Sequence, residues 1–255
     1  MNALMMAGIL LAALGGLMFG SFLNVVIHRL PLGESLVAPG SHCPNCQAPI
    51  RPWHNVPLVS WILLRGRCRD CHAPIAMRYP LVEAATALLF VGVVLASRSV
   101  VGLTLGLILV AVLVPAALID LDHRIIPNKL LLPAAVAAIA VGTALDPTHE
   151  YGRLIAAAAA GGFLLAAAIA YPRGMGMGDV KLAAVLGLFL GKAVGPAMLV
   201  ALVVGVVVGA AIIARTGTRV GRKTAVPFGP MLGIGGLVGL YAGSTVVAWY
   251  LGTFA

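Results

Sequence analysis

Four cysteines make the clearest chemical pattern in this chain, and all four fall within one polar stretch. The motif "CPNC" holds Cys43 and Cys46, and the motif "CRDC" holds Cys68 and Cys71. The Cys-x-x-Cys spacing lets two thiolate sulfurs reach one metal ion, and two such pairs complete a tetrahedral site. Four thiolates leave no coordination position open for a reactive water. The pattern therefore predicts a structural zinc site.

Two alternatives for the cysteine stretch stay open. The thiols could form disulfides, although disulfides are rare in the reducing cytoplasm. His42, His54 and His72 lie near the cysteines and could be ligands, but surface histidines are the simpler interpretation.

The second chemical pattern is a pair of aspartates at the ends of apolar runs. The chain has only eight Asp and Glu among its 255 residues. Asp120 closes an apolar run in "LIDLDHRIIPN", and Asp179 opens another in "GMGMGDVKL". Two carboxylates that meet in a site of low polarity cannot both ionise cheaply, so one keeps a proton. Such a pair can activate a water and protonate a carbonyl oxygen, although the proton belongs to the pair and not to either residue.

Each aspartate also has a simpler interpretation. Asp179 follows flexible glycines and could cap the helix that it opens, as Asp commonly does. Asp120 could be a solvated acid paired with Arg124. However, an acid at a helix C-terminus opposes the helix dipole, and ionisable groups at membrane depth usually mark function.

Three neighbours of Asp179 are candidates for positioning a substrate. Gly176 and Gly178 carry no side chain, so an extended substrate backbone could approach the acid closely. Lys181 could bias that acid toward its ionised form, or it could extend its ammonium group to phospholipid.

The elements that carry these residues belong to a membrane protein. Hydrophobic residues make up 61% of the chain and charged residues 10%, with a mean hydropathy of +1.04, whereas soluble chains are usually about a quarter charged. The fold class predicted is therefore an all-α polytopic membrane protein, with about eight transmembrane helices and a small zinc-binding cytoplasmic loop domain. The helices are expected at residues 3–27, 81–97, 99–119, 129–145, 154–172, 180–194, 196–214 and 230–252.

The basic residues predict the orientation of these helices. The net charge is +9, but Lys and Arg are spread between apolar runs, so we expect no nucleic-acid partner. With an outside N-terminus, the outer loops hold only Arg98, Arg153 and Lys192 of the 17 Lys and Arg. The positive-inside rule then places Asp120 and Asp179 at the cytoplasmic face.

The predicted helices and loops divide the chain into three parts. Residues 1–27 form the first transmembrane helix, because no basic segment or cleavage site marks a removable signal peptide. Residues 28–80 form the cytoplasmic zinc-binding loop domain. Residues 81–255 form a transmembrane peptidase core, if the two aspartates that it carries act together.

Several motifs in this order resemble bacterial type IV prepilin peptidases. These are membrane aspartic proteases of the GxGD type, often also N-methyltransferases. The resemblance covers nearly the whole chain and rests on "GSFLNVVIHRLP", the paired Cys-x-x-Cys motifs, "RYPLVEAATALLF", "IDLDHRIIPN" and "GMGDVKL". It implies Asp120 and Asp179 as the catalytic pair, with Asp122 as the alternative to Asp120 because Asp122 matches the family motif less well. It also implies a multi-pass protein of the bacterial inner membrane, which cleaves the leader from type IV prepilins or type II secretion pseudopilins at the cytoplasmic face. The expected partners are this substrate and the lipid bilayer.

The resemblance further implies that S-adenosylmethionine donates a methyl group to the new N-terminal amine. No glycine-rich nucleotide motif of the Rossmann kind is present, and the residues that bind the donor are unknown from sequence. Glu83 could contact the substrate amine, the methyl donor or Arg78. Asn24 and Arg29 could stabilise the junction between the first helix and the loop.

Overall fold

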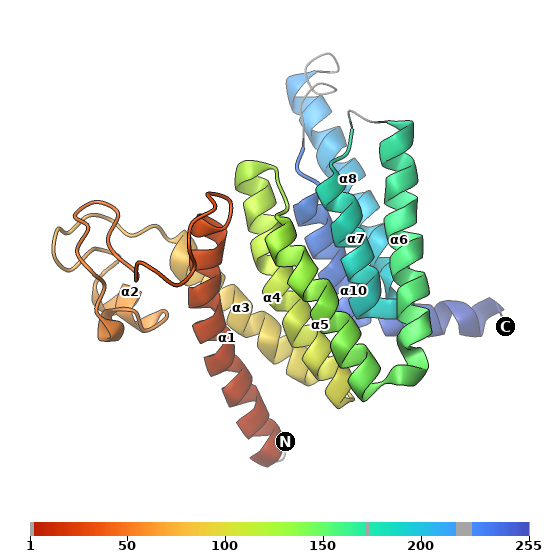
Figure 1. The fold of residues 1–255 in the computed structure, drawn as a ribbon, viewed down its shortest axis with the longest axis horizontal. Helices are drawn as coiled ribbons and strands as arrows, with labels where there is room; N and C mark the ends of the chain where they lie inside the picture. Colours follow the sequence, from red (N-terminus) through yellow and green to blue (C-terminus); the bar gives the residue numbers. More distant parts are fainter. Residues whose placement is uncertain (1–2, 172–173, 218–225, 255) are drawn as a thin grey trace. The chain divides into compact units, whose positions relative to one another are not determined.

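The computed structural model describes residues 3–171, 174–217 and 226–254 of a chain that divides into two compact units (Figure 1). Unit 1 is Met1–Ala96, and unit 2 is Ser97–Ala255. Within the described residues the regular structure is helical, apart from two isolated β-bridges in unit 1. This confirms the predicted all-α class.

Unit 1 consists of two long helices and the loop between them. Helix α1 (Ala3–Arg29) packs against α3 (Arg78–Ala96), and the loop contains η1 (Pro52–His54) and α2 (Val59–Leu63). The sequence grouped residues 81–96 with the later helices, whereas α3 belongs to the same compact unit as α1.

Small residues allow α1 and α3 to approach closely. A Cβ atom added at Gly16 would lie 2.5 Å from the Cα of Ala87, and one at Gly20 would lie 2.7 Å from the Cα of Glu83. Glycine is therefore required at both positions, as is typical of helix contacts in membranes.

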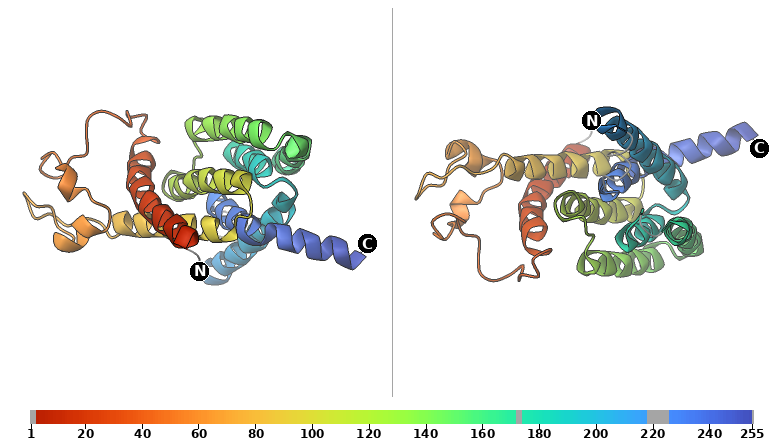
Figure 2. Two further views of the ribbon diagram at one scale, coloured as in Figure 1. Left: turned by 90° about the horizontal axis from the view of Figure 1, so that it is seen from below. Right: turned by 90° about the horizontal axis from the view of Figure 1, so that it is seen from above.

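Unit 2 is a bundle of long helices joined by short connections. In Figure 1 these helices lie side by side, and both views of Figure 2 show the C-terminal end of α10 extending away from the other helices of the unit. Its elements are α4 (Val100–His123), α5 (Asn128–Leu145), η2 (Pro147–His149), α6 (Glu150–Ala170), α7 (Met177–Leu190), η3 (Gly191–Ala193), α8 (Val194–Thr216) and α10 (Gly229–Phe254).

Local sequence signals explain where several of these helices begin and end. The Ser99 side chain caps α4 by accepting the Gly102 N–H at 3.1 Å, which satisfies one donor left free at the helix start. Arg124 adopts the left-handed conformation and ends α4. Pro196 and Pro230 lie in the first turns of α8 and α10, where a missing N–H costs nothing.

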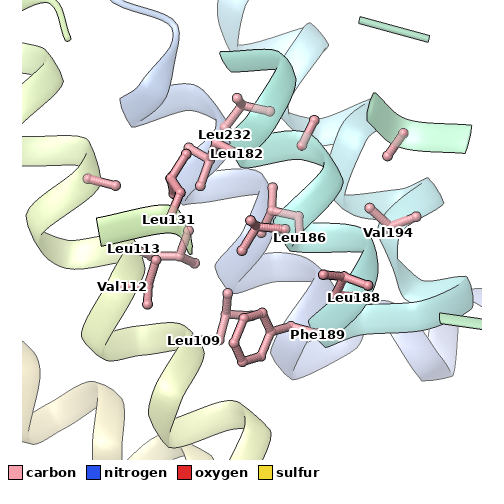
Figure 3. Close-up of a cluster of buried hydrophobic side chains, with 14 of the residues drawn as sticks. Leu109, Val112, Leu113, Leu131, Leu182, Leu186, Leu188, Phe189, Val194 and Leu232 are labelled. Atoms are coloured by element: carbon pink, nitrogen blue, oxygen red, sulfur yellow. The ribbon is translucent and has the colours of Figure 1, made fainter. Parts of the chain in front are cut away.

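The core of unit 2 holds α4, α5, α7 and α10 together. Leu109 and Leu113 of α4 and Leu182 and Leu186 of α7 are almost fully buried, with Leu232 of α10 beside them (Figure 3). This core fixes the helices that carry the candidate site.

Seven stretches of the described residues are long and apolar enough to cross a membrane. The predicted segments 180–194 and 196–214 fall within one of them, Met177–Thr216, which is divided by η3 into α7 and α8. Helix α7 has only 14 residues. Arg173, Arg219, Arg222 and Lys223, which contributed to the predicted orientation, and residue 172 of the segment 154–172, lie outside the described residues.

Candidate active site and metal centre

Asp120 and Asp179 lie at the same end of unit 2, on the last turn of α4 and the first turn of α7 (Figure 1). Both are buried, with 5% and 8% of their surface exposed, and the two helices that carry them are in contact. Asp122, the alternative to Asp120, is exposed. The structure therefore brings the two predicted aspartates together in a buried site.

The carboxylate of Asp120 is held by the start of a distant helix. Its Oδ2 accepts a buried hydrogen bond of 2.8 Å from the backbone N–H of Gly229, the first residue of α10. Gly229 was not identified from the sequence. Pro230, directly after it, signals a helix start, but no local pattern relates that start to Asp120.

The carboxylate of Asp179 is held within its own helix. Gly176 occupies the N-cap position of α7, and Asp179 lies three residues further on. The Oδ2 atom of Asp179 accepts the Gly176 N–H at 3.3 Å. The simpler interpretation of Asp179 therefore needs a correction, because it supports the helix start from the third position and not as the N-cap residue itself.

The predicted positioning residues have contacts within the chain. A Cβ atom added at Gly178 would lie 3.1 Å from the Cβ of Ile126, so close packing in the protein already explains this glycine. The Lys181 Nζ atom donates to Asn128 Oδ1, at the start of α5, at 3.0 Å. Lys181 thus joins α7 to α5 at the end of the bundle where the aspartates lie.

The four predicted metal ligands converge in unit 1. The Sγ atoms of Cys43, Cys46, Cys68 and Cys71 all lie within 4.8 Å of one another, and those of Cys43 and Cys71 are 3.8 Å apart. Sulfurs bound tetrahedrally to zinc at about 2.3 Å are separated by roughly 3.8 Å. The donor set and its spacing therefore fit a zinc ion.

The two cysteine pairs are built as copies of one small motif. Cys43 N–H donates to the Ala48 carbonyl at 3.0 Å, and Cys68 N–H donates to the Ala73 carbonyl at 2.8 Å. The β-bridges His42–Pro49 and Arg67–Pro74 close the two turns. The signal is visible in the sequence as "HCPNCQAPI" and "RCRDCHAPI", but sequence reasoning overlooked it.

Polar groups around the second turn favour the thiolate form. The backbone N–H of Ala73 and the side chain of Asn45 lower the pKa of Cys71 to about 6. Metal ions bind the thiolate and not the thiol. Against the backbone N–H of Ala48, burial and the other thiols of the cluster raise the pKa of Cys46 to about 12, so the four cysteines do not ionise alike.

The nearby histidines have other contacts. His42 Nδ1 lies 3.0 Å from the Gly40 carbonyl oxygen, and His54 Nε2 lies 3.3 Å from Arg69 Nη1. Among the described residues, the group that could hold a metal ion consists of the four cysteines, which agrees with the simpler interpretation of these two histidines.

A cavity of about 610 Å³ also lies within unit 1. Its lining includes the carboxylates of Glu34, Asp70 and Glu83 and the side chain of Asn24. The Asn24 Nδ2 atom donates to the Tyr79 carbonyl at 3.1 Å, and therefore links α1 to α3.

Glu83 is the buried acid of this cavity wall. It is 8% exposed, and its Oε2 accepts the Leu58 N–H at 2.8 Å. Leu58 has a φ of 59° and a ψ of −50°, a region that a leucine rarely adopts. Glu83 thus holds a strained turn at the cavity, and such strain is common at functional sites.

The fold and these sites define a class: a multi-pass helical membrane protein with two buried carboxylates in one unit and, in the other, a four-cysteine cluster that could hold a metal ion. Residues 14–97 match the Bacterial Peptidase A24 N-terminal domain, and residues 107–214 match the Type IV leader peptidase family. The chain belongs to the type IV leader peptidase family.

Two of the relatives that this chain resembles match it over nearly its whole length. The prepilin leader peptidase/N-methyltransferase of Aeromonas hydrophila is 37% identical, covering 96% of this chain and 94% of the relative. The type 4 prepilin-like proteins leader peptide-processing enzyme of Escherichia coli O78:H11 is 38% identical, covering 91% and 93%. A prepilin leader peptidase/N-methyltransferase of Myxococcus xanthus is 43% identical, and there the match covers 69% of this chain and 54% of the relative. No solved structure is a significant match.

Proposed function

We propose that this protein cleaves the leader peptide of type IV prepilins or type II secretion pseudopilins, with Asp120 and Asp179 as the catalytic pair. The observation that carries the proposal is the burial of both carboxylates at one end of unit 2, where each is oriented by a backbone N–H. The names of the relatives supply the class of substrate.

The chemistry follows from two adjacent carboxyl groups that share one proton. The ionised group takes a proton from a water molecule while the water oxygen bonds to the carbonyl carbon of the scissile peptide. The protonated group gives its proton to the carbonyl oxygen. The tetrahedral intermediate then loses its C–N bond as the leaving amine takes up a proton.

The proposed place of cleavage is the cytoplasmic face of the bacterial inner membrane. The distribution of Lys and Arg supports this orientation. The apolar N-terminal helix of the substrate would lie in the bilayer, with its basic leader in the cytoplasm, so the scissile bond would reach the aspartates at the interface.

The test replaces each aspartate separately and follows leader removal from a purified type IV prepilin. Asp120→Ala and Asp179→Ala are each expected to lower the cleavage rate by at least about a thousandfold. Asp122→Ala, which removes an exposed carboxylate, is the matched control and should cleave normally. An unchanged rate in either of the first two variants, at equal protein level in the membrane, would remove that residue from the pair.

We also propose that the protein methylates the new N-terminal amine, with S-adenosylmethionine supplying the methyl group. The cavity of unit 1 suits such a donor, because its volume is typical of small-molecule sites. The carboxylates of Glu34, Asp70 and Glu83 would accept hydrogen bonds from ribose and amine groups and would attract the positive sulfonium. Glu83 would do so while it holds the turn at Leu58.

The mass of the processed pilin tests this second activity. Pilin processed by the purified protein with added S-adenosylmethionine is expected to carry one methyl group, and pilin processed without it should carry none. Glu83→Gln is expected to reduce methylation more than cleavage. Complete cleavage with an unmethylated product would leave a protein that is a peptidase alone.

We propose a zinc ion, in a structural role, for the four-cysteine centre. The sulfur spacing supports the metal, and four thiolates would complete its coordination. The ion would then fix the loop that forms the cavity wall.

A further inference from the structure

We infer that Gly229 is a positioning residue for Asp120, and that the start of α10 is therefore a third component of the peptidase site beside α4 and α7. The inference rests on the proposed function, because it concerns the orientation of a proposed catalytic carboxylate.

The hydrogen bond from Gly229 uses a donor that the helix leaves free. The first N–H groups of a helix have no partner within the helix, and Gly229 is the first residue of α10. Pro230 has no N–H, and the Leu232 N–H is already bonded to the Phe228 carbonyl at 3.0 Å. The Gly229 N–H is therefore directed at Asp120 Oδ2 across 2.8 Å in a buried setting.

The absence of a side chain at Gly229 is as important as its N–H. A Cβ atom at this position would lie 2.7 Å from Asp120 Oδ2 and 2.9 Å from its Cβ. Both values are below normal contact, so any larger residue would displace the carboxylate. Glycine thus allows the backbone to approach closely enough to donate.

The orientation of each carboxylate depends on a different part of the fold. Asp179 is held by Gly176, three residues away on the same helix. Asp120 is held from a position 109 residues away, so its orientation depends on the docking of α10.

Two variants at position 229 test the inference on the full-length protein with a purified type IV prepilin. Gly229→Ala is expected to lower kcat about a hundredfold through displacement of the carboxylate. Replacement of Gly229 by glycolic acid, which turns the amide into an ester, removes the N–H and adds no side chain. It is expected to lower kcat about tenfold, because a hydrogen bond to a charged group is lost. KM should change less than threefold in both, since substrate contacts remain.

Gly209, in α8, provides the matched control, because a Cβ atom there meets nothing within 4 Å. Gly209→Ala and the ester at position 209 should keep the normal kcat. If Gly229→Ala does not fold, the ester alone decides. A normal kcat for the ester, with Asp120→Ala inactive, would overturn the role of Gly229 and leave the proposed function intact. Normal cleavage by Asp120→Ala would instead overturn the catalytic pair itself.

Discussion

Lys181 lies two residues after Asp179, yet its ammonium group is bonded to Asn128 on another helix. This hydrogen bond joins the starts of α5 and α7 at the end of unit 2 that holds the aspartates. Because both side chains are exposed, the bond is solvated and its contribution is small. The bond nevertheless connects two helix starts, and we infer that it limits the movement of α7 relative to α5.

A double-mutant cycle measures the interaction between Lys181 and Asn128. Lys181→Ala and Asn128→Ala are each expected to lower kcat/KM for prepilin cleavage about two- to fivefold, as for an exposed polar pair. The double variant should be no worse than either single variant, because both remove the same contact. Lys192→Ala, an exposed lysine in η3, is the control. Effects that multiply in the double variant would show that the two residues act separately.

The residues that the sequence singled out, and that the structure places close together, belong to types that are rare in this chain. Aspartates are scarce in this chain, so Asp120 and Asp179 were conspicuous, and the cysteines had a diagnostic spacing. Gly229 was missed because glycine is common here and its partner is 109 residues away. The bond between Glu83 and Leu58 was missed for the same reason, since sequence periodicity does not report contacts between a loop and a helix.

At the scale of the elements, a group of charged residues fastens α6 to the turn that precedes it. Arg153 is 9% exposed. Its Nη2 lies 2.6 Å from Asp146 Oδ2, and its Nη1 lies 3.2 Å from Glu150 Oε2. From sequence Arg153 was only one of three outer basic residues, but its partners make it the anchor of the connection between α5 and α6.

Loss of Arg153 is expected to destabilise unit 2. Arg153→Leu leaves two carboxylates near each other without their cation, and breaking a buried ion pair costs about 3 kcal/mol. The unfolding midpoint in detergent measures the change. Arg98→Leu, at an exposed position, should shift stability by less than about 0.5 kcal/mol. Equal midpoints for the two variants would contradict the anchoring role.

Asp146 should make this contribution depend on pH. The hydrogen bond to His149, followed by that from Thr148 and the charge on Arg153, holds the pKa of Asp146 below its ordinary value. A carboxylate with a lowered pKa stabilises the fold above about pH 4 and loses this effect as the pH falls through the folded value. The midpoints of the unchanged protein and of Asp146→Asn should therefore differ at pH 7 and converge toward pH 3.

Helix positions were predictable from apolar runs, but helix partners were not. The seven membrane-length stretches cover the expected segments, because apolar length is a property of the sequence itself. The assignment of α3 to unit 1 depends on close contacts such as Gly16 against Ala87. Glycines and alanines occur in every long helix, so composition alone does not select one pairing.

At the scale of the whole molecule, the two compact units divide the proposed tasks. Unit 2 carries the carboxylate pair, and unit 1 carries the cysteine centre and the cavity. The two differ in what holds them together. The bundle of unit 2 has an extensive apolar core, whereas the loop of unit 1 has little regular structure between α1 and α3.

Metal removal should therefore affect the units differently. A zinc chelator, or Cys68→Ser, is expected to make the loop sensitive to trypsin at Arg65, Arg67 and Arg69, because metal binding supplies the folding energy of such small sites. The helices of unit 2 should stay intact in the same digest, and added zinc should restore protection after chelation. A loop that stays resistant after complete loss of the metal would show that the ion is not structural.

The shortness of α7 has a consequence for the surrounding lipid. Its 14 residues rise about 21 Å, whereas the hydrocarbon layer of a bilayer is about 30 Å thick. Lys192, just beyond its far end, is exposed. With that end at one membrane surface, Asp179 lies below the other surface, buried among the helices of unit 2. Water must then reach it between these helices or where the surrounding bilayer is thinner. Acyl-chain length thus becomes a determinant of how easily water reaches the aspartates, and thicker membranes should hold the pair in a drier, slower state.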